Sequence, residues 1–355
     1  MSIIRRNIIH NFAGRIISGV LGFVFVPIYI RYLGIEAFGL VGFFVSLQAI
    51  VIILDMGLST TTSREVAKQI GESGDDGDLP SLMYSLELIY VASAVVILGL
   101  FISIGGWLAE EWIKAEGIPS ATLRWCILVF GFSIAVRWPC GFYSGVLTGA
   151  ERQVLYNSLY TTFSLLKSAG SVFVVAVISP TIEAFAGWQA FVASAEFVVM
   201  KLVYRRLSTQ FPGKIPGRFR IDLIRRVWRF SAGVGLNTIL AIGIKQLDRI
   251  LISGMLPIAL LGCYTSAHLL YSGLAMISGP FCTATFPRFA KLYAQDNIDD
   301  LARLYHTSSQ MIAFIVAPAA AVLFFFSFEI LSFWTQSEGV AQNASATLSF
   351  LSIAG

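Results

Sequence analysis

The apolar residues of this chain are gathered into long blocks rather than mixed with polar residues at the period of a helix or strand. A helix needs about 20 residues to cross a hydrocarbon layer of about 30 Å. Blocks of that length lie at about 7–30, 38–59, 82–104, 121–146, 154–178, 182–204, 230–256, 258–286 and 305–328, and a tenth begins near residue 346. Because 56% of the residues are hydrophobic and only 13% are charged, the chain is not an ordinary soluble protein. We predict an all-α, polytopic transmembrane helix bundle.

Basic residues are distributed unequally between the two predicted sides of the membrane. If the N-terminus is cytoplasmic, the inner segments hold sixteen Lys and Arg residues, whereas the outer loops hold two, Arg31 and Lys114. Such an excess marks the cytoplasmic side. Arg5 and Arg6 lead directly into a full-length span without a cleavage site, so we expect the first helix to be retained. The predicted protein is multi-pass with a cytoplasmic N-terminus.

An internal repeat is suggested where consecutive spans are joined. Four residues between the first two spans recur, at an offset of 223 positions, between the seventh and eighth: Leu33, Ile35, Phe38 and Gly39 correspond to Leu256, Ile258, Leu261 and Gly262. The offset predicts two pseudo-repeated six-helix lobes around a central cavity, at 1–204 and 230–355, with a basic cytoplasmic connector at 205–229. The second lobe would then end near residue 427, so we expect it to be incomplete here, after about 3.5 helices, with about 70 residues lacking.

The connector carries eight basic residues and one acidic residue. Near its end, Ile221, Ile224, Val227 and Trp228 recur at helical spacing. One interpretation is a basic helix that lies on anionic lipid headgroups. The other is that the charges only determine the topology.

Ionisable side chains inside the predicted spans are the most informative feature. Each one costs about 2.5–3.5 kcal/mol at the centre of a helix unless it faces protein or a wet cavity. The basic set and the acidic set are Arg15, Arg137, Lys167, Lys245 and Arg249, and Asp55, Glu87, Glu196 and Asp248. Lys201 and Arg124 lie near span ends, where they can reach the headgroups.

Two interpretations of this charged set are open. In the first, the nine side chains form internal ion pairs that only hold helices together. In the second, the basic residues project into a water-filled cavity between the lobes and bind an anionic group, most plausibly phosphate. Lys245 and Arg249 share one helix face, and Asp248 is spaced to pair with Lys245, which leaves one cation for a ligand.

Small residues and prolines predict how the spans pack and bend. Gly141, Gly145 and Gly149 recur at every fourth position, which allows a neighbouring backbone to approach closely. Trp138 and Pro139, beside Arg137, predict a kink in that helix.

The sequence lacks the motifs of several functional classes. No nucleotide-binding loop, dinucleotide fingerprint or nucleophile elbow is present. The four cysteines lie in apolar stretches, and the three histidines share no ligand spacing, so we predict no metal and no other cofactor. The formal net charge of +4 follows from the topology bias, so no nucleic-acid partner is predicted.

The order of short motifs resembles the polysaccharide (O-antigen type) flippases of the multidrug/oligosaccharidyl-lipid/polysaccharide exporter superfamily. Near the start of the chain these residues are Asn11, Gly14, Pro27, Arg31, Leu33, Gly34, Phe38, Gly39, Leu40, Leu54, Asp55, Gly57, Leu58 and Arg64. Later matches are Leu147, Gly149, Arg152 and Gln153, the segment 248–251, and Leu261, Gly262, Tyr264 and Ala267.

The resemblance implies a bacterial inner-membrane transporter, not an enzyme. It would move an undecaprenyl-pyrophosphate-linked oligosaccharide, such as an O-antigen, capsule or exopolysaccharide unit, from the inner to the outer leaflet by alternating access. The substrate-binding candidates are Arg15, Arg137, Lys167, Lys245 and Arg249. Asp55, Glu87, Glu196 and Asp248 are candidates for ion coupling. Membrane lipids and other polysaccharide-assembly membrane proteins are the expected partners.

Two alternatives have their own sequence requirements. A cation-coupled multidrug antiporter of the same superfamily would need acidic residues to dominate the cavity of the first lobe. A membrane-embedded polysaccharide-assembly enzyme would need catalytic groups near a membrane face and a substantial domain outside the membrane. The longest predicted outer stretches, 105–120 and 329–345, are too short for such a domain.

Overall fold

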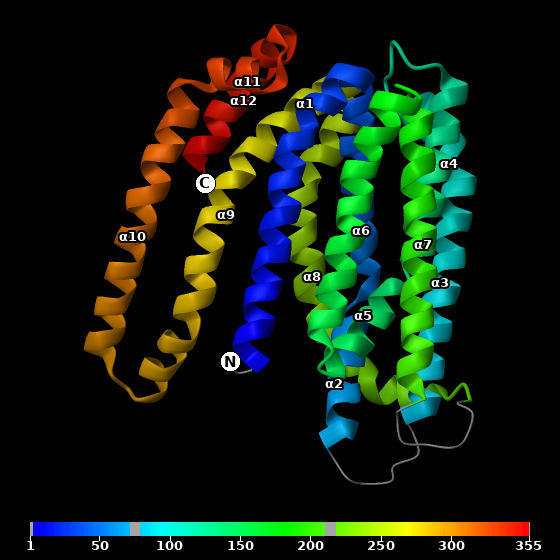
Figure 1. Ribbon diagram of the computed structural model, residues 1–355, viewed down its shortest axis with the longest axis vertical. Helices are drawn as coiled ribbons and strands as arrows, with labels where there is room; N and C mark the ends of the chain where they lie inside the picture. Colours follow the sequence, from blue (N-terminus) through cyan, green and yellow to red (C-terminus); the bar gives the residue numbers. More distant parts are fainter. Residues whose placement is uncertain (1–2, 72–78, 210–217, 355) are drawn as a thin grey trace. The chain divides into compact units, whose positions relative to one another are not determined.

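The computed structural model describes the backbone of residues 3–71, 79–209 and 218–354, but not the side chains of 3–22, 69–71, 226–237, 354 and several positions between 275 and 294 (Figure 1). All regular structure in these described ranges is helical. The chain divides into two compact units, Met1–Ile258 and Ala259–Gly355. The lobe boundaries expected from the sequence repeat stay a prediction.

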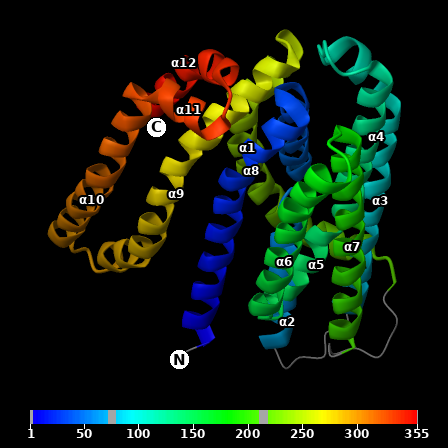
Figure 2. The same ribbon diagram turned by 45° about the horizontal axis from the view of Figure 1, so that its top comes forward.

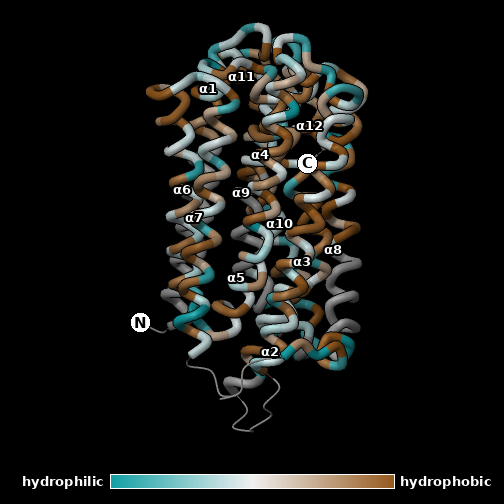
Figure 3. Tube along the Cα trace, turned by 90° about the vertical axis from the view of Figure 1, so that its right-hand side faces the viewer, coloured by the Kyte–Doolittle hydropathy of each residue, from teal (hydrophilic) through white to brown (hydrophobic). Residues whose placement is uncertain are grey.

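Six described helical segments are long and apolar enough to cross a membrane: Phe23–Asp55, Leu79–Trp112, Ser120–Gly149, Gln153–Ile178, Ile182–Ser208 and Ile298–Phe325. Hydrophobic residues recur along the length of the helices (Figure 3). Many of them point outward; Val95 and Val96, for example, are 66% and 62% exposed. Outward apolar side chains suit a lipid surround, and the predicted all-α polytopic membrane bundle is confirmed.

The first two predicted spans lie in one element, α1 (Ile3–Val51), which has a corner at Gly34. Gly34 has a φ of 83°, a conformation that glycine adopts without the steric cost of a Cβ atom. The second span was expected to continue to about residue 59, but it ends with the short 3₁₀ helix η1 (Ile52–Asp55). Met56 and Gly57 then take positive φ angles, and α2 (Leu58–Gly71) begins in a new direction.

The next spans are α3 (Leu79–Trp107), which continues as the π-helix η2 (Leu108–Trp112), and a pair of helices, α4 (Ser120–Arg137) and α5 (Cys140–Gly149). The kink predicted at Trp138 and Pro139 is a two-residue interruption between α4 and α5, and both residues keep backbone angles in the right-handed helical region. Proline has no N–H to donate and its ring crowds the preceding turn, so the helix restarts after it.

Two further spans follow in the first unit. They are α6 (Gln153–Phe173), extended by the π-helix η3 (Val174–Ile178), and α7 (Ile182–Ser208). The side chain of Thr181 accepts a hydrogen bond from the backbone N–H of Ala184 and so caps α7. Helix α4 packs on α7, α1 on α6, and α2 on α5 (Figure 2).

The predicted glycine stripe lies where α5 meets α2. A Cβ atom on Gly145 would lie only 2.5 Å from the backbone oxygen of Ser59, and one on Gly149 would also meet the backbone of α2, at Ser63. Gly141 faces the ring of Tyr90. The stripe therefore serves close helix packing, as expected, and it joins the short helices that follow the two breaks.

Helix α8 (Ile221–Met255) begins nine residues before the predicted span, so the expected interfacial segment is part of one continuous helix. Part of the connector, 210–217, lies outside the described residues. At its far end α8 is tied to the segment that follows α3. Trp112 Nε1 donates to Ser253 Oγ at 3.1 Å, and the N–H of Ile258 donates to the carbonyl of Lys114 at 2.9 Å.

The second unit contains most of α9 (Ile258–Ala294), together with α10 (Ile298–Phe325), α11 (Ser327–Thr335) and α12 (Glu338–Ala354). The stretch 329–345, expected to be an outer loop, is helical instead. The packed helices α11 and α12 bury Leu331, Ala341, Ala344 and Leu348 between them and their neighbours. Hydropathy over about 20 residues misses such helices because each is too short to span a membrane.

Candidate functional site

Three ionisable side chains from three helices meet inside the first unit. Glu196 of α7 accepts hydrogen bonds from Arg137, at the end of α4, and from Lys167 of α6. Both cations contact the same oxygen: Arg137 Nε lies 3.0 Å and Lys167 Nζ lies 2.5 Å from Glu196 Oε2. We call Arg137, Lys167 and Glu196 the charged triad. It has one negative and two positive groups.

The arginine of the triad lies beside the helix interruption. Arg137 is the last residue of α4, and Trp138 and Pro139 follow it. The terminal carbonyls of a helix carry partial negative charge, which favours a cation at this position. Because α4 packs on α7, the guanidinium group reaches Glu196 across the contact between these helices.

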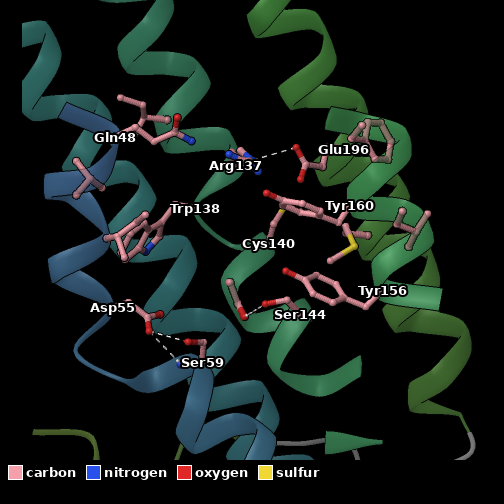
Figure 4. Close-up of a pocket in the computed structure, with 17 residues that line it drawn as sticks. Gln48, Asp55, Ser59, Arg137, Trp138, Cys140, Ser144, Tyr156, Tyr160 and Glu196 are labelled. Carbon is pink, nitrogen blue, oxygen red and sulfur yellow. Dashed lines mark hydrogen bonds and ion pairs between the residues drawn. The ribbon is translucent and has the colours of Figure 1, made fainter. Parts of the chain in front are cut away.

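Two members of the triad, Arg137 and Glu196, lie in the wall of a cavity of about 390 Å³ (Figure 4). Arg137 and Glu196 line this cavity together with Asp55. A second cavity of about 140 Å³ is lined by Arg137 and Lys167. The triad is thus reached from both cavities, and Arg137 belongs to both linings. The exposed fractions of its side chains are 31% for Arg137, 17% for Lys167 and 8% for Glu196.

Asp55 faces the larger cavity from the turn between η1 and α2. Its carboxylate accepts hydrogen bonds from the hydroxyl and the backbone N–H of Ser59, at 2.7 and 3.3 Å, and from the hydroxyl of Tyr90. The larger cavity is lined by two acidic residues, Asp55 and Glu196, and one basic residue, Arg137. Lys167 lines only the smaller cavity, but it contacts Glu196, so the four charges together sum to zero.

Neutral polar and aromatic side chains complete the lining. Gln48, Ser144, Tyr156 and Tyr160 face the larger cavity (Figure 4), and Gln189 faces the smaller one. The indole N–H of Trp138 is buried without a hydrogen-bond partner in the described part of the chain. These neutral lining residues were not among the predicted site residues, because only ionisable side chains were considered. Isolated amide and hydroxyl groups within apolar spans were the available signal.

Glu87, another predicted site residue, lies elsewhere in the same unit. Its carboxylate accepts a hydrogen bond from the hydroxyl of Tyr143 at 2.9 Å, and Lys201 Nζ is 4.0 Å away. Lys201 also lies over the ring of Phe197, 5.7 Å from its centre. Glu87 lines neither of the two cavities described above. An ion-coupling role for Glu87 stays a prediction.

The remaining predicted residues are not brought to the triad by any described contact. Lys245 is exposed, whereas Asp248 and Arg249 are partly buried on α8. The backbone N–H of Arg249 donates to the Asp248 carboxylate at 2.8 Å. The side chain of Arg15 lies outside the described residues. Binding roles for Arg15, Lys245 and Arg249 and an ion-coupling role for Asp248 stay predictions.

One further observation bears on metal binding. Among the described residues, no three His, Cys, Asp or Glu side chains lie close enough together to hold a metal ion.

At the start of α8, Arg220 donates to Asp222 through two nitrogens, at 2.6 and 3.3 Å. These hydrogen bonds hold the pKa of Asp222 below its ordinary value.

The fold is similar to that of solved membrane transporters. An inward-facing multidrug resistance transporter of the MATE family, in the MOP superfamily, matches with a TM-score of 0.67 and 16% identity over 95% of this chain and 78% of that one. A MOP superfamily transporter from Pyrococcus furiosus, described as having a binding pocket of reverse polarity, matches with a TM-score of 0.62 and 18% identity over 98% and 76%. Identities this low show a shared fold.

Sequence comparison identifies the family. No curated protein matches the chain significantly. The family model for polysaccharide biosynthesis proteins, however, matches residues 4–293, which is most of the chain. The resemblance to polysaccharide flippases drawn from the sequence motifs is confirmed, and the chain belongs to the polysaccharide biosynthesis protein family.

Proposed function

We propose that this multi-pass membrane protein flips a lipid-diphosphate-linked oligosaccharide, such as an O-antigen, capsule or exopolysaccharide unit, from the inner to the outer leaflet. The observation that carries the proposal is the charged triad, in which two cations at a cavity wall share one carboxylate oxygen. Family membership supports a role in polysaccharide assembly. The protein acts as a transporter, since moving the lipid between leaflets changes no covalent bond.

The chemistry of the triad suits a diphosphate. Arginine offers a planar fork of donors that matches phosphate oxygens, and lysine adds a strongly hydrated point charge. The single carboxylate of Glu196 neutralises only one of the two cations. The triad therefore keeps a net positive charge in a region of low dielectric constant, where an anion is bound more strongly than in water.

The neutral part of the lining suits a sugar. Tyr156 and Tyr160 project from α6 into the cavity, and Gln48 and Ser144 face it from other helices (Figure 4). Hydroxyl and amide groups can both donate to and accept from sugar hydroxyls. Aromatic rings offer an apolar body with a polar tip. The cavity of about 390 Å³ is within the size range of sites for small molecules.

A second candidate is a cation-coupled multidrug antiporter. Asp55 supports it, because this carboxylate lines the cavity and accepts hydrogen bonds from two neutral residues, Ser59 and Tyr90. The fold is also shared with a multidrug resistance transporter. We favour the first function because Glu196 is already paired with Arg137 and Lys167. Arg137 lines both cavities and Lys167 the smaller one, and both would repel a cationic drug.

A transport assay distinguishes the two candidates. Purified protein is placed in liposomes with a fluorescent lipid-diphosphate-linked oligosaccharide, and the label that reaches the other leaflet is quantified with a membrane-impermeant quencher. We expect protein-dependent flipping that Lys167→Gln reduces at least tenfold. Lys201→Gln, which removes a lysine away from both cavities, serves as the matched control. Transport of a cationic drug without movement of the lipid would contradict the proposal and favour the antiporter.

The direction of transport rests on the predicted topology, with the protein in the bacterial inner membrane and its N-terminus in the cytoplasm. Membrane lipids and other polysaccharide-assembly membrane proteins are its proposed neighbours. A reporter fused to the N-terminus that is active only in the cytoplasm tests the orientation. Periplasmic reporter activity would reverse the assignment of sides.

A further inference from the structure

We infer that Glu196 is a built-in competitor of the substrate: its carboxylate occupies the two cations of the empty site, and an incoming diphosphate displaces it. This inference rests on the proposed function and assigns a regulating role within the same site. It differs from ion coupling, because the carboxylate acts by competing for Arg137 and Lys167 and not by carrying an ion.

The geometry of the contact supports competition. A single oxygen, Glu196 Oε2, accepts from both Arg137 Nε and Lys167 Nζ. An anionic oxygen placed between two cationic donors is also the arrangement that a phosphate oxygen would adopt there. Glu196 thus holds the position that the ligand needs. One singly charged group such as Glu196 contacts both cations but neutralises only one of the two positive charges, so a multiply charged diphosphate is favoured over a singly charged anion.

Access to the triad makes the exchange feasible. Glu196 and Arg137 line the larger cavity, while Arg137 and Lys167 line the smaller one. An anion in either cavity reaches a cation without crossing the packed core. The released carboxylate has the larger cavity beside it, where water and the donors of Tyr160 and Gln48 can receive it.

Competition would also explain how the substrate leaves. A site of two unpaired cations would hold a diphosphate tightly on both sides of the membrane, and tight binding without release gives slow transport. A tethered carboxylate is present at a high effective concentration and competes for the cations continuously. Its return speeds dissociation of the substrate, so a weaker but faster site results.

The experiment measures binding of inorganic pyrophosphate to the purified protein by calorimetry and the unfolding temperature with and without pyrophosphate. We expect Glu196→Gln to bind pyrophosphate about tenfold more tightly than the wild type, because the competing charge-assisted hydrogen bonds are weakened. Without the anion this variant should unfold at a lower temperature, since two cations remain uncompensated. Pyrophosphate should then raise its unfolding temperature more than that of the wild type.

Control variants separate competition from structural support. Glu87→Gln also neutralises a glutamate of the first unit, but its pyrophosphate affinity should equal that of the wild type. Glu196→Asp shortens the side chain and should give an intermediate affinity, which provides a result if Glu196→Gln does not fold. Flipping of the lipid-linked oligosaccharide by Glu196→Gln should be slower despite the tighter binding.

The outcomes distinguish this inference from the function on which it rests. If the wild type binds pyrophosphate and flips the lipid, but neither Glu196 variant binds more tightly, the competitor role is wrong and the proposed function stands. If the wild type neither binds pyrophosphate nor flips the lipid, the proposed function is wrong and the inference falls with it.

Discussion

Two glutamates of the first unit, Glu196 and Glu87, contact the same kinds of groups in different settings. Glu196 touches two cations at the wall of two cavities. Glu87 touches one tyrosine hydroxyl and a more distant lysine, and it lies beside the core cluster that contains Tyr143. An acidic residue within a predicted span is therefore not by itself evidence of a site. Under the proposed function, the cavity next to Glu196 and the excess of positive charge around it distinguish this cluster from the one around Glu87.

The same comparison applies to the two lysines. Lys167 lines a cavity and contacts Glu196 at 2.5 Å, whereas Lys201 lies 4.0 Å from Glu87 and over the ring of Phe197. Lys201 lies near the end of its predicted span, where a lysine side chain can reach the headgroups. The structure adds that it has partners there. The substitutions below test whether the two clusters differ in function as they differ in surroundings.

The largest expected effect is on transport by Arg137→Gln. This variant removes the guanidinium that lines both cavities, and the flipping rate should fall about 100-fold, since a hydrogen bond to a charged group contributes about 1.5–3 kcal/mol. The matched control, Lys201→Gln, should stay within about twofold of the wild type. Equal losses in both variants, measured in the liposome assay at equal protein levels, would remove the distinction between the clusters.

Glu87→Leu should change stability instead. The substitution leaves the buried hydroxyl of Tyr143 without its acceptor, which costs about 2 kcal/mol in the free energy of unfolding. Denaturation in detergent micelles, followed by circular dichroism, measures the change. Added pyrophosphate should not compensate for this loss beyond its effect on the wild type. A specific rescue by pyrophosphate would place Glu87 in the binding site.

Arg137→Lys sharpens the role of the arginine. Lysine keeps the charge but lacks the planar fork of donors, so flipping should fall about tenfold, less than with Arg137→Gln. The ratio of the two rates separates the contribution of charge from that of geometry. Identical rates for the lysine variant and the wild type would mean that only the charge matters.

The smallest effect is expected for Tyr143→Phe. The change removes one hydrogen bond to Glu87 and should cost about 1 kcal/mol of stability while the flipping rate per folded molecule is unchanged. Thermal unfolding and the liposome assay provide the two measurements. A marked loss of flipping by this variant would show that the Glu87 cluster takes part in transport.

Much of the fold was predictable from local sequence. The spans at 82–104, 154–178 and 182–204 agree with α3, α6 and α7 within a few residues at most boundaries. The interruption at Trp138 and Pro139 was also predicted from residue type, as a kink. The polar extensions of α8 and α10 were not predicted, because these helices begin in segments of mixed polarity that a hydropathy criterion assigns to loops.

The site was predictable as a set of residues but not as an arrangement. Arg137, Lys167 and Glu196 were all singled out, yet nothing in the spacing shows that they meet, since Arg137 and Lys167 lie 59 and 29 positions from Glu196. Sequence spacing predicts only pairs within one helix, such as Lys245 and Asp248. Neutral members of the lining, Gln48 and Tyr160, carried too little signal to be chosen.

By itself, the sequence determined that this chain enters a membrane, roughly where its helices run and which charges they carry into the apolar layer. These properties follow from the free energy of transferring each segment from water to hydrocarbon, which is approximately a sum over its residues. Only the tertiary structure decided which charged side chains line a common cavity and which contact neighbouring helices away from it. That outcome depends on the rotation and contact of whole helices, such as α4, α6 and α7 around Glu196.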